Sequence, residues 1–423
     1  MKRTYLLSTI LLTSLALGVG CSVNAEVQPT ETTGATSGSG GGTSGSAGGS
    51  DTGGGGGESP FCVIIDKDIV KDTTLGADDC YVVEGDRDVT AELTIEPGVT
   101  LHFDAGASLS IDDNGGALIA NGTAAEPIVF TGTQAVAGFW KGVMIRSNSP
   151  LNSMKFVTVE YGGNEKVAGY SSTAAANLYI YHEARLVLED CSFNHGAALG
   201  LGIYKDKVDI TSFARNTFAG NQGAPIRLPA NHVTVLDAAS DFVGGPGMEN
   251  GEPNIVVINN DLTVNSTWLD HWVPYLFDND AIYVEADLTL KPGVMLIFPE
   301  DGRMIVDGSG SLNAVGTADN AISFTSTTKV AGYWRGVHVA SSSPLNVLEY
   351  VDIGYGGRSK ITGCGACDPA NILLYYAPSR LTITHSNIHD SLGWGVYVPG
   401  DGTLTDTANT YSSNTSGDVN FVQ

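Results

Sequence analysis

The sequence predicts an all-β solenoid made of two similar halves, and three observations predict it. The segment LTIEPGVTLHF at residues 93–103 returns as LTLKPGVMLIF at residues 288–298, an offset of 195 residues. Short alternating apolar runs, separated by Gly, Asn, Asp or Pro, indicate strands rather than helices. Matched apolar positions also recur every 21 to 23 residues, as from Val159 to Ile180 to Ile203, which is typical of coils stacked along an axis.

The duplication extends through most of the chain. GFWKGV at 138–143 returns as GYWRGV at 332–337, and SPLN at 149–152 returns at 343–346, both at an offset of 194. We therefore place one half at residues 61–254 and the other at 255–423. What both halves keep is expected to be architecture, as with Trp140 and Trp334. What one half has alone is a candidate for function.

Residues 1–20 have the pattern of an export signal. Two basic residues precede an apolar run that is short for a membrane span. The run ends in LGVGC at 17–21, which resembles the bacterial lipobox, where a peptidase cuts before a cysteine that is then acylated. The resemblance implies a palmitate-bearing anchor on Cys21 and, with Ser22 following, an outer-membrane address. The alternative is an ordinary secretory signal followed by a chance cysteine.

Residues 21–60 are expected to be a flexible tether. Between 22 and 59 there is no Leu, Ile or aromatic residue, and Gly, Ser and Thr dominate. Such a composition cannot bury enough apolar surface to order itself. We expect this segment to hold the folded part away from a membrane.

The charge of the chain limits its partners. The formal net charge is −25, and residues 61–100 hold ten acidic residues against three basic ones. Such a surface repels nucleic acid and attracts cations. No EF-hand loop is present, so we expect no cofactor, with Ca²⁺ the one ion left open, and no metal site. We expect a monomer.

The cysteines fit an oxidising compartment outside the inner membrane. We predict a disulfide between Cys62 and Cys80, at the start of the folded region. A second is predicted between Cys364 and Cys367, within a loop. Cys191 is expected to be a small buried thiol, because the other half has Ser386 in its place.

The repeated blocks carry a family resemblance. LTI-PGV-L-F, G-W-G-V and L-x-x-V-x-I-x-Y-G-G resemble bacterial right-handed parallel β-helix repeat proteins of the pectate-lyase-like superfamily, over essentially all of residues 61–423. The resemblance implies the right-handed parallel β-helix fold. It implies no reaction, because no enzyme motif matches. The esterase-like Gln134-Ala-Val-Ala137 is not kept in the second half.

Candidate site residues come from two places where the halves diverge. Loops 164–176 and 358–370 have equal length and different content, which suits binding. The segment from His385 to Trp394 is polar, and we expect it near tyrosines of the neighbouring coil, although an ordinary polar strand face reads the same way. The weak catalytic candidates are His385, His389, Asp390, Asp190 and His195, and the binding candidates are Glu165, Tyr170, Asp368, Tyr375, Tyr376 and Trp394.

These observations predict an exported, lipid-anchored envelope protein of the cell surface or periplasmic face. We expect a non-catalytic binding or structural role, with an extended glycan as ligand, because a solenoid presents a long rigid face. The alternative is a polysaccharide lyase or glycoside hydrolase. Passive envelope structure without a ligand is a third interpretation.

Overall fold

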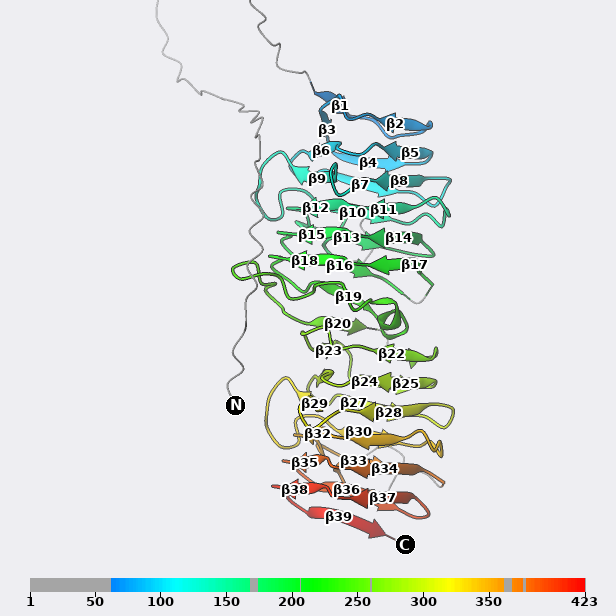
Figure 1. The fold of residues 1–423 in the computed structure, drawn as a ribbon, viewed down its shortest axis with the longest axis vertical. Coiled ribbons are helices and arrows are strands. Elements are labelled where there is room, and N and C mark those ends of the chain that lie inside the picture. Colours follow the sequence, from blue (N-terminus) through cyan, green and yellow to red (C-terminus); the bar gives the residue numbers. More distant parts are fainter. Residues whose placement is uncertain are drawn as a thin grey trace, which may run out of the picture. The chain divides into compact units, whose positions relative to one another are not determined.

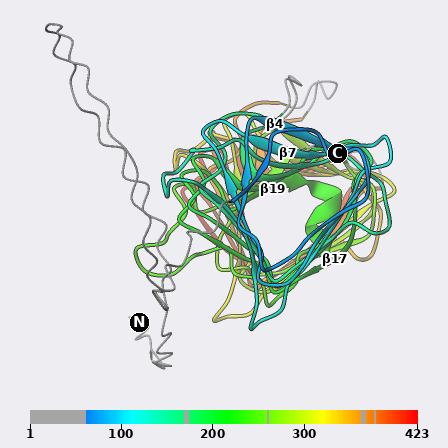
Figure 2. The same ribbon diagram turned by 90° about the horizontal axis from the view of Figure 1, so that it is seen from above.

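The computed structural model describes residues 62–167, 174–205, 207–258, 261–360, 367–375 and 378–422, which belong to one compact unit, Glu58–Gln423. The predicted signal, tether and Cys21 lie outside these residues, as do Tyr170, Cys364 and Tyr376. The described part is a parallel β-helix, as predicted, with strands stacked in successive coils (Figure 1). Viewed from above, three sides enclose one core (Figure 2).

One thirteen-stranded sheet, here called the shared sheet, runs through both halves. It makes the two halves one continuous stack, because β19 pairs directly with β20. Its strands are β4 (Asp86–Val89), β7 (Ser108–Ile111), β10 (Gly142–Ile145), β13 (Ala176–Ile180), β16 (Leu199–Ile203), β19 (Ile226–Pro229), β20 (Ile255–Ile258), β23 (Tyr275–Phe277), β26 (Met295–Phe298), β29 (Ile322–Ser326), β32 (Val351–Gly354), β35 (Asn387–His389) and β38 (Thr410–Ser412).

The other two sides of the first half are separate sheets. The seven-stranded β6 sheet contains β1 (Val63–Ile65), β3 (Tyr81–Val83), β6 (Thr100–Phe103), β9 (Ile128–Gly132), β12 (Val157–Glu160), β15 (Ser192–Asn194) and β18 (Thr217–Ala219). The six-stranded β8 sheet contains β2 (Thr73–Leu75), β5 (Glu92–Ile95), β8 (Ala117–Asn121), β11 (Ser153–Lys155), β14 (Arg185–Glu189) and β17 (Asp209–Ala214).

The second half has two sheets of its own. The seven-stranded β27 sheet contains β21 (Asp261–Leu262), β24 (Ala281–Val284), β27 (Arg303–Val306), β30 (Gly336–Val339), β33 (Ala370–Leu374), β36 (Trp394–Pro399) and β39 (Gly417–Val422). The six-stranded β28 sheet contains β22 (Ser266–Trp268), β25 (Asp287–Leu290), β28 (Ser311–Val315), β31 (Val347–Glu349), β34 (Arg380–Thr384) and β37 (Thr403–Thr407).

The second half is turned by one of the three sides relative to the first. β6 lies in its own sheet, but its sequence equivalent β26 lies in the shared sheet; β7 lies in the shared sheet, but its equivalent β27 does not. The cause is the junction. After β19 the chain forms a 3₁₀ helix, η1 (Ala230–Val235), and a bridge between Asp241 and Thr217, and only then starts β20. The second copy therefore begins on the shared sheet, one side further along the coil than the first copy, which begins on the β6 sheet.

Apolar ladders fill the interior. Alternate residues of each strand point inward, and the register places Leu101 beside Phe130 and Phe193 beside Phe218. All four are at most 1% exposed. The rings of Phe193, Phe218 and Phe242 stack in succession, with centroids 5.2 and 5.1 Å apart. Burial of this area is the main favourable contribution to folding.

The two conserved tryptophans are architectural, as expected. Trp140 and Trp334 are fully buried. Each stacks on a core phenylalanine, Phe103 at 3.9 Å and Phe298 at 4.3 Å between centroids. Each indole N–H donates to a main-chain oxygen, of Glu160 and Gly354, at 2.8 and 2.7 Å. Neither ring is available to a ligand.

Buried asparagines satisfy the backbone at a corner of the first half. The Asn221 side-chain oxygen accepts from Gly196 N at 3.0 Å, and its amide donates to Phe193 O at 2.9 Å. Asn177 donates to Asn221, and Asn221 donates to Asn250, so three coils are linked. These bonds supply partners for groups that the turns would otherwise leave unpaired.

Asn194 and Asn216 lie 22 residues apart, as do Asn387 and Asn409, but this spacing does not place them in one ladder. Asn194 pairs with Ala219, and Asn387 with Thr410. Asn216 and Asn409 do occupy equivalent turns, where each side-chain oxygen accepts a main-chain N–H, from Cys191 and Ser386.

The cysteine predictions are confirmed where the structure describes them. Cys62 and Cys80 form a disulfide, and Cys191 is a buried free thiol. Cys367 is buried and disulfide-bonded, and its predicted partner Cys364 lies outside the described residues.

Replacing Asn221 by Ala should lower the free energy of unfolding by about 2–4 kcal/mol, because a buried N–H and a buried carbonyl each lose a partner. Urea unfolding of the Asn221→Ala variant measures this. Asn164→Ala, at an exposed position, is the control and should cost no more than about 0.5 kcal/mol. Equal losses in the two variants would contradict the role given to the corner.

Candidate functional site

A groove of about 400 Å³ lies on the outer side of the shared sheet, in the second half. It crosses five neighbouring strands, β23, β26, β29, β32 and β35. One end of its floor is apolar and the other end is polar. The lining residues are Asn254, Leu276, Met295, Ile297, Ser323, Thr325, Ser326, Thr327, Lys329, Asp352, Tyr355 and His389.

The polar end is organised around His389. Its Nδ1 lies 2.8 Å from Asp390 Oδ2, and its Nε2 lies 3.4 Å from Asp352 Oδ1. The Asn387 amide donates to the same Asp352 oxygen at 2.7 Å. The imidazole is 13% exposed and packs edge-on against Tyr355, with centroids 5.3 Å apart. Both ring nitrogens are thus engaged by carboxylates.

The carboxylates favour the imidazolium form. The hydrogen bond to Asp352 raises the pKa of His389, against partial burial, and the bond to Asp390 adds to it. The same contact to His389 lowers the pKa of Asp352, and the Lys329 charge contributes in the same direction. The two carboxylates therefore stabilise the charged form of His389.

The first half lacks this cluster. Thr158 stands where the second half has Asp352, Asn194 where it has His389, and Ala135 where it has Lys329. Tyr161 is kept as the equivalent of Tyr355. Because these changes fall on one groove, the comparison between halves marks it as the candidate functional site.

Four of the five predicted catalytic candidates occupy tight turns with positive φ, namely Asp190 (56°), His195 (53°), His385 (52°) and Asp390 (51°). Asp390 contacts His389 of the groove cluster, and the other three do not. Phe156 and Arg215 hold the same corner as Asp190 in adjacent coils, also with positive φ. His195 stacks on Tyr161 and His385 on Tyr350, with centroids 5.2 and 5.0 Å apart. Their contacts join successive coils, and none of the three lines the groove.

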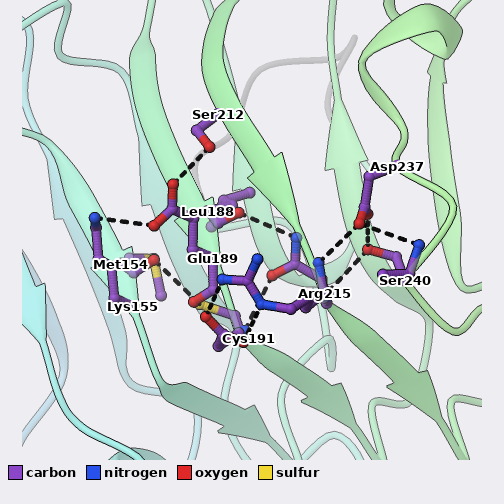
Figure 3. A network of polar contacts seen from close by, with 12 residues as sticks. Met154, Lys155, Leu188, Glu189, Cys191, Ser212, Arg215, Asp237 and Ser240 are labelled. Atoms are coloured by element: carbon purple, nitrogen blue, oxygen red, sulfur yellow. Dashed lines mark hydrogen bonds and ion pairs between the residues drawn. The ribbon is translucent and has the colours of Figure 1, made fainter.

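The corner between Glu189 and Cys191, which contains Asp190, is a polar network (Figure 3). Arg215 Nε donates to Asp190 at 2.7 Å, which lowers the pKa of Asp190. Lys155 and Ser212 both contact the neighbouring carboxylate of Glu189, at 2.9 and 2.6 Å. Cys191 Sγ lies beneath and donates to Met154 O at 3.2 Å. Burial raises the pKa of this thiol to about 12, so it is not a nucleophile.

The described ends of the divergent loops pack on outer sheet faces of different sides. Val167 and Ala174, at the two ends of the first loop, pack with Met144 and Tyr179 of the shared sheet. Cys367 of the second packs with Leu373 on the β27 sheet. The two faces differ because the second half is turned by one side.

The remaining described binding candidates are apart from the groove lining. Glu165 lies 3.5 Å from Lys141, and Asp368 lies 3.2 Å from Lys360. Trp394 and Tyr375 are part-buried against the apolar patch of the β27 sheet. Among the predicted residues that the structure describes, only His389 and Asp390 take part in the groove cluster.

The sequence reasoning missed Asp352, Lys329 and Tyr355. A residue-by-residue alignment of the halves would have found the first two, because each replaces a neutral residue with a charge. Among the described residues, no group of three His, Cys, Asp or Glu side chains is arranged to hold a metal ion. Within that same part of the chain, no helix is long and apolar enough to span a membrane.

Comparison with known proteins supports the fold. A family model described as a pectate-lyase like beta helix domain matches residues 67–174. No curated protein and no solved structure matches the chain. The match supports a carbohydrate-related, extracellular protein. It ends before the groove begins, so it says nothing about the groove residues.

The His389 cluster should give a defined pH dependence. Since its pKa is raised in the fold, its contribution to stability is complete below the unfolded value of about 6.5 and is lost as pH rises through the folded pKa. Since the pKa of Asp352 is lowered, its contribution is present above about 3.9 and is lost on acidification. The free energy of unfolding of wild type should therefore be higher than that of His389→Asn, and this difference should be larger at about pH 5.5 than at about pH 9.

NMR titration of the histidine ring protons measures the pKa directly, and urea unfolding at both pH values measures the stability difference. Asp352→Asn should lower the pKa of His389, because it removes the largest cause of the shift. A wild-type pKa at or below about 6.5 would contradict the cluster.

Proposed function

We propose that this protein binds an extended, uncharged glycan along the groove of the shared sheet and does not cleave it. The groove supports this because it follows the solenoid axis. Five strands spaced about 4.8 Å apart give it a length of about 19 Å, which suits several sugar rings in a row. Its apolar floor and its hydroxyl-bearing side, with Ser323, Thr325 and Thr327, suit the two kinds of surface that a sugar presents.

The engagement of both His389 nitrogens is the observation that favours binding over catalysis. A general acid must direct its proton at the leaving oxygen, and a general base must have a free lone pair. Both positions of His389 face carboxylates instead. A hydrolase also needs a carboxylic acid with a raised pKa, whereas the pKa of Asp352 is lowered. The cluster therefore suits a rigid set of hydrogen-bonding groups.

Charge favours an uncharged ligand. In the groove and its cluster, two basic side chains, Lys329 and His389, are matched by two carboxylates, Asp352 and Asp390. That balance leaves no excess positive charge to hold a uronate. The net charge of −25 also disfavours the approach of polyanions. The competing proposal is a polysaccharide lyase or hydrolase, which the pectate-lyase-like match favours.

We further propose that the protein is exported and anchored by lipid on Cys21, with residues 22–59 as a tether. The lipobox-like LGVGC supports this. Metabolic labelling with an alkyne palmitate, in a bacterial host, should mark the wild type and not Cys21→Ala. Equal labelling of both proteins would exclude Cys21 as the acylation site.

Glycan binding should depend on the groove and not on its counterpart in the first half. The variant Asp352→Thr/His389→Asn carries the first-half residues at both positions, so it keeps side chains that this fold accepts. We expect it to weaken binding about tenfold or more, since two charged hydrogen-bonding partners are lost. Calorimetry with a panel of neutral and uronate oligosaccharides measures this.

Thr158→Ala, at the equivalent first-half position, is the matched control and should bind as wild type does. Unsaturated or newly reducing products in the same incubations, absent with the double variant, would replace the binding proposal with a lyase or hydrolase. Tighter binding of uronates than of neutral glycans would overturn the charge argument.

A further inference from the structure

Trp272 is unlike every other tryptophan of the chain. Its side chain is 79% exposed, whereas Trp140, Trp268 and Trp334 are fully buried and Trp394 is part-buried. A large aromatic ring placed in water forgoes the burial that normally stabilises it. The first half has Asp78 at this position. The ring is therefore no part of the shared architecture.

The backbone of Trp272 is also strained. Its φ is 64°, in the left-handed region that bulky residues seldom adopt. The Asp270 carboxylate fixes the turn by accepting the Trp272 N–H at 2.9 Å. Asn or Gly would fit this conformation at lower cost. An exposed, strained aromatic residue is thus retained without a benefit to the fold, which points to a function.

The position of Trp272 connects it to the groove. It lies two residues before Pro274, whose carbonyl accepts Ile255 N at 2.9 Å. Asn254, next to Ile255, lines the groove, and so does Leu276 of β23. The tryptophan therefore stands at the corner leading into the first strand of the groove, at the end opposite His389.

We propose that Trp272 is a stacking platform for a sugar ring and extends the glycan site beyond its apolar end. The C–H face of an uncharged pyranose packs on an indole face, and the open ring offers such a face without rearrangement of the protein. This inference rests on the proposed glycan binding. It adds a subsite at the rim, so the glycan would contact the ring at one end and the His389 cluster at the other.

Binding and fluorescence of the full-length mature protein test the platform. Trp272→Asn removes the ring and suits the left-handed backbone, so the variant should fold, with an unchanged or higher melting temperature. It should lower the affinity for the neutral glycan that binds wild type by about five- to tenfold. Trp272→Phe should retain most of the affinity. Val70→Asn, at another apolar residue that is 65% exposed, is the control and should bind as wild type does.

Acrylamide quenching gives an independent measure, because Trp272 is the most exposed tryptophan. Saturating glycan should protect wild-type fluorescence from acrylamide, and Trp272→Asn should show no such protection. Unchanged affinity in Trp272→Asn, or wild-type quenching unaffected by bound glycan, would overturn the platform and leave the groove proposal standing. If no glycan of the panel binds wild type, both proposals fail.

Discussion

Each strand inside a sheet finds its main-chain partners in the coils before and after it, and the rest of the structure follows from that constraint. This pairing sets each side chain beside its counterparts in adjacent coils. A core residue must therefore pack against the residues directly above and below it in the same ladder. Corners must turn the chain without losing main-chain hydrogen bonds. They do so with left-handed residues such as Asp190 and with buried amides such as Asn221.

The same constraint governs where function can reside. Outward positions on a strand are free of the demands of the core, but some are covered by loop residues. The first-half part of the shared sheet is covered by loop residues over Met144 and Tyr179. In the second half, the shared sheet is formed by the equivalents of the β6-sheet strands. They lie there because the second copy starts one side late, at β20. In the second half, the described end of the corresponding loop, at Cys367, packs on the next side instead.

The fold could be predicted from the sequence because its cause is repetitive: alternating apolar residues, turn residues and a period near 22. His389 and Asp390 could be named as candidates, but their contact with Asp352 could not be predicted. Asp352 and His389 lie in adjacent coils separated by a long loop, so the period near 22 does not relate their positions. The rotation of the second half by one side could not be predicted either. Residues 236–254 have no alternating apolar pattern from which the number of sides in the junction could be read. Most predicted catalytic candidates sit at corners because polar residues tolerate left-handed turns.

The offset of the second half also determines the valency that this scaffold can have. If equivalent faces of the two halves lay on the same side, a groove on each half would form one continuous groove. A single polymer bound to one groove would then have a high effective concentration at the other. Here equivalent positions look out from different sides. A first half given the same groove residues would engage a separate strand of polymer. In this geometry a second groove would therefore cross-link two polymer strands and would not hold one strand more tightly.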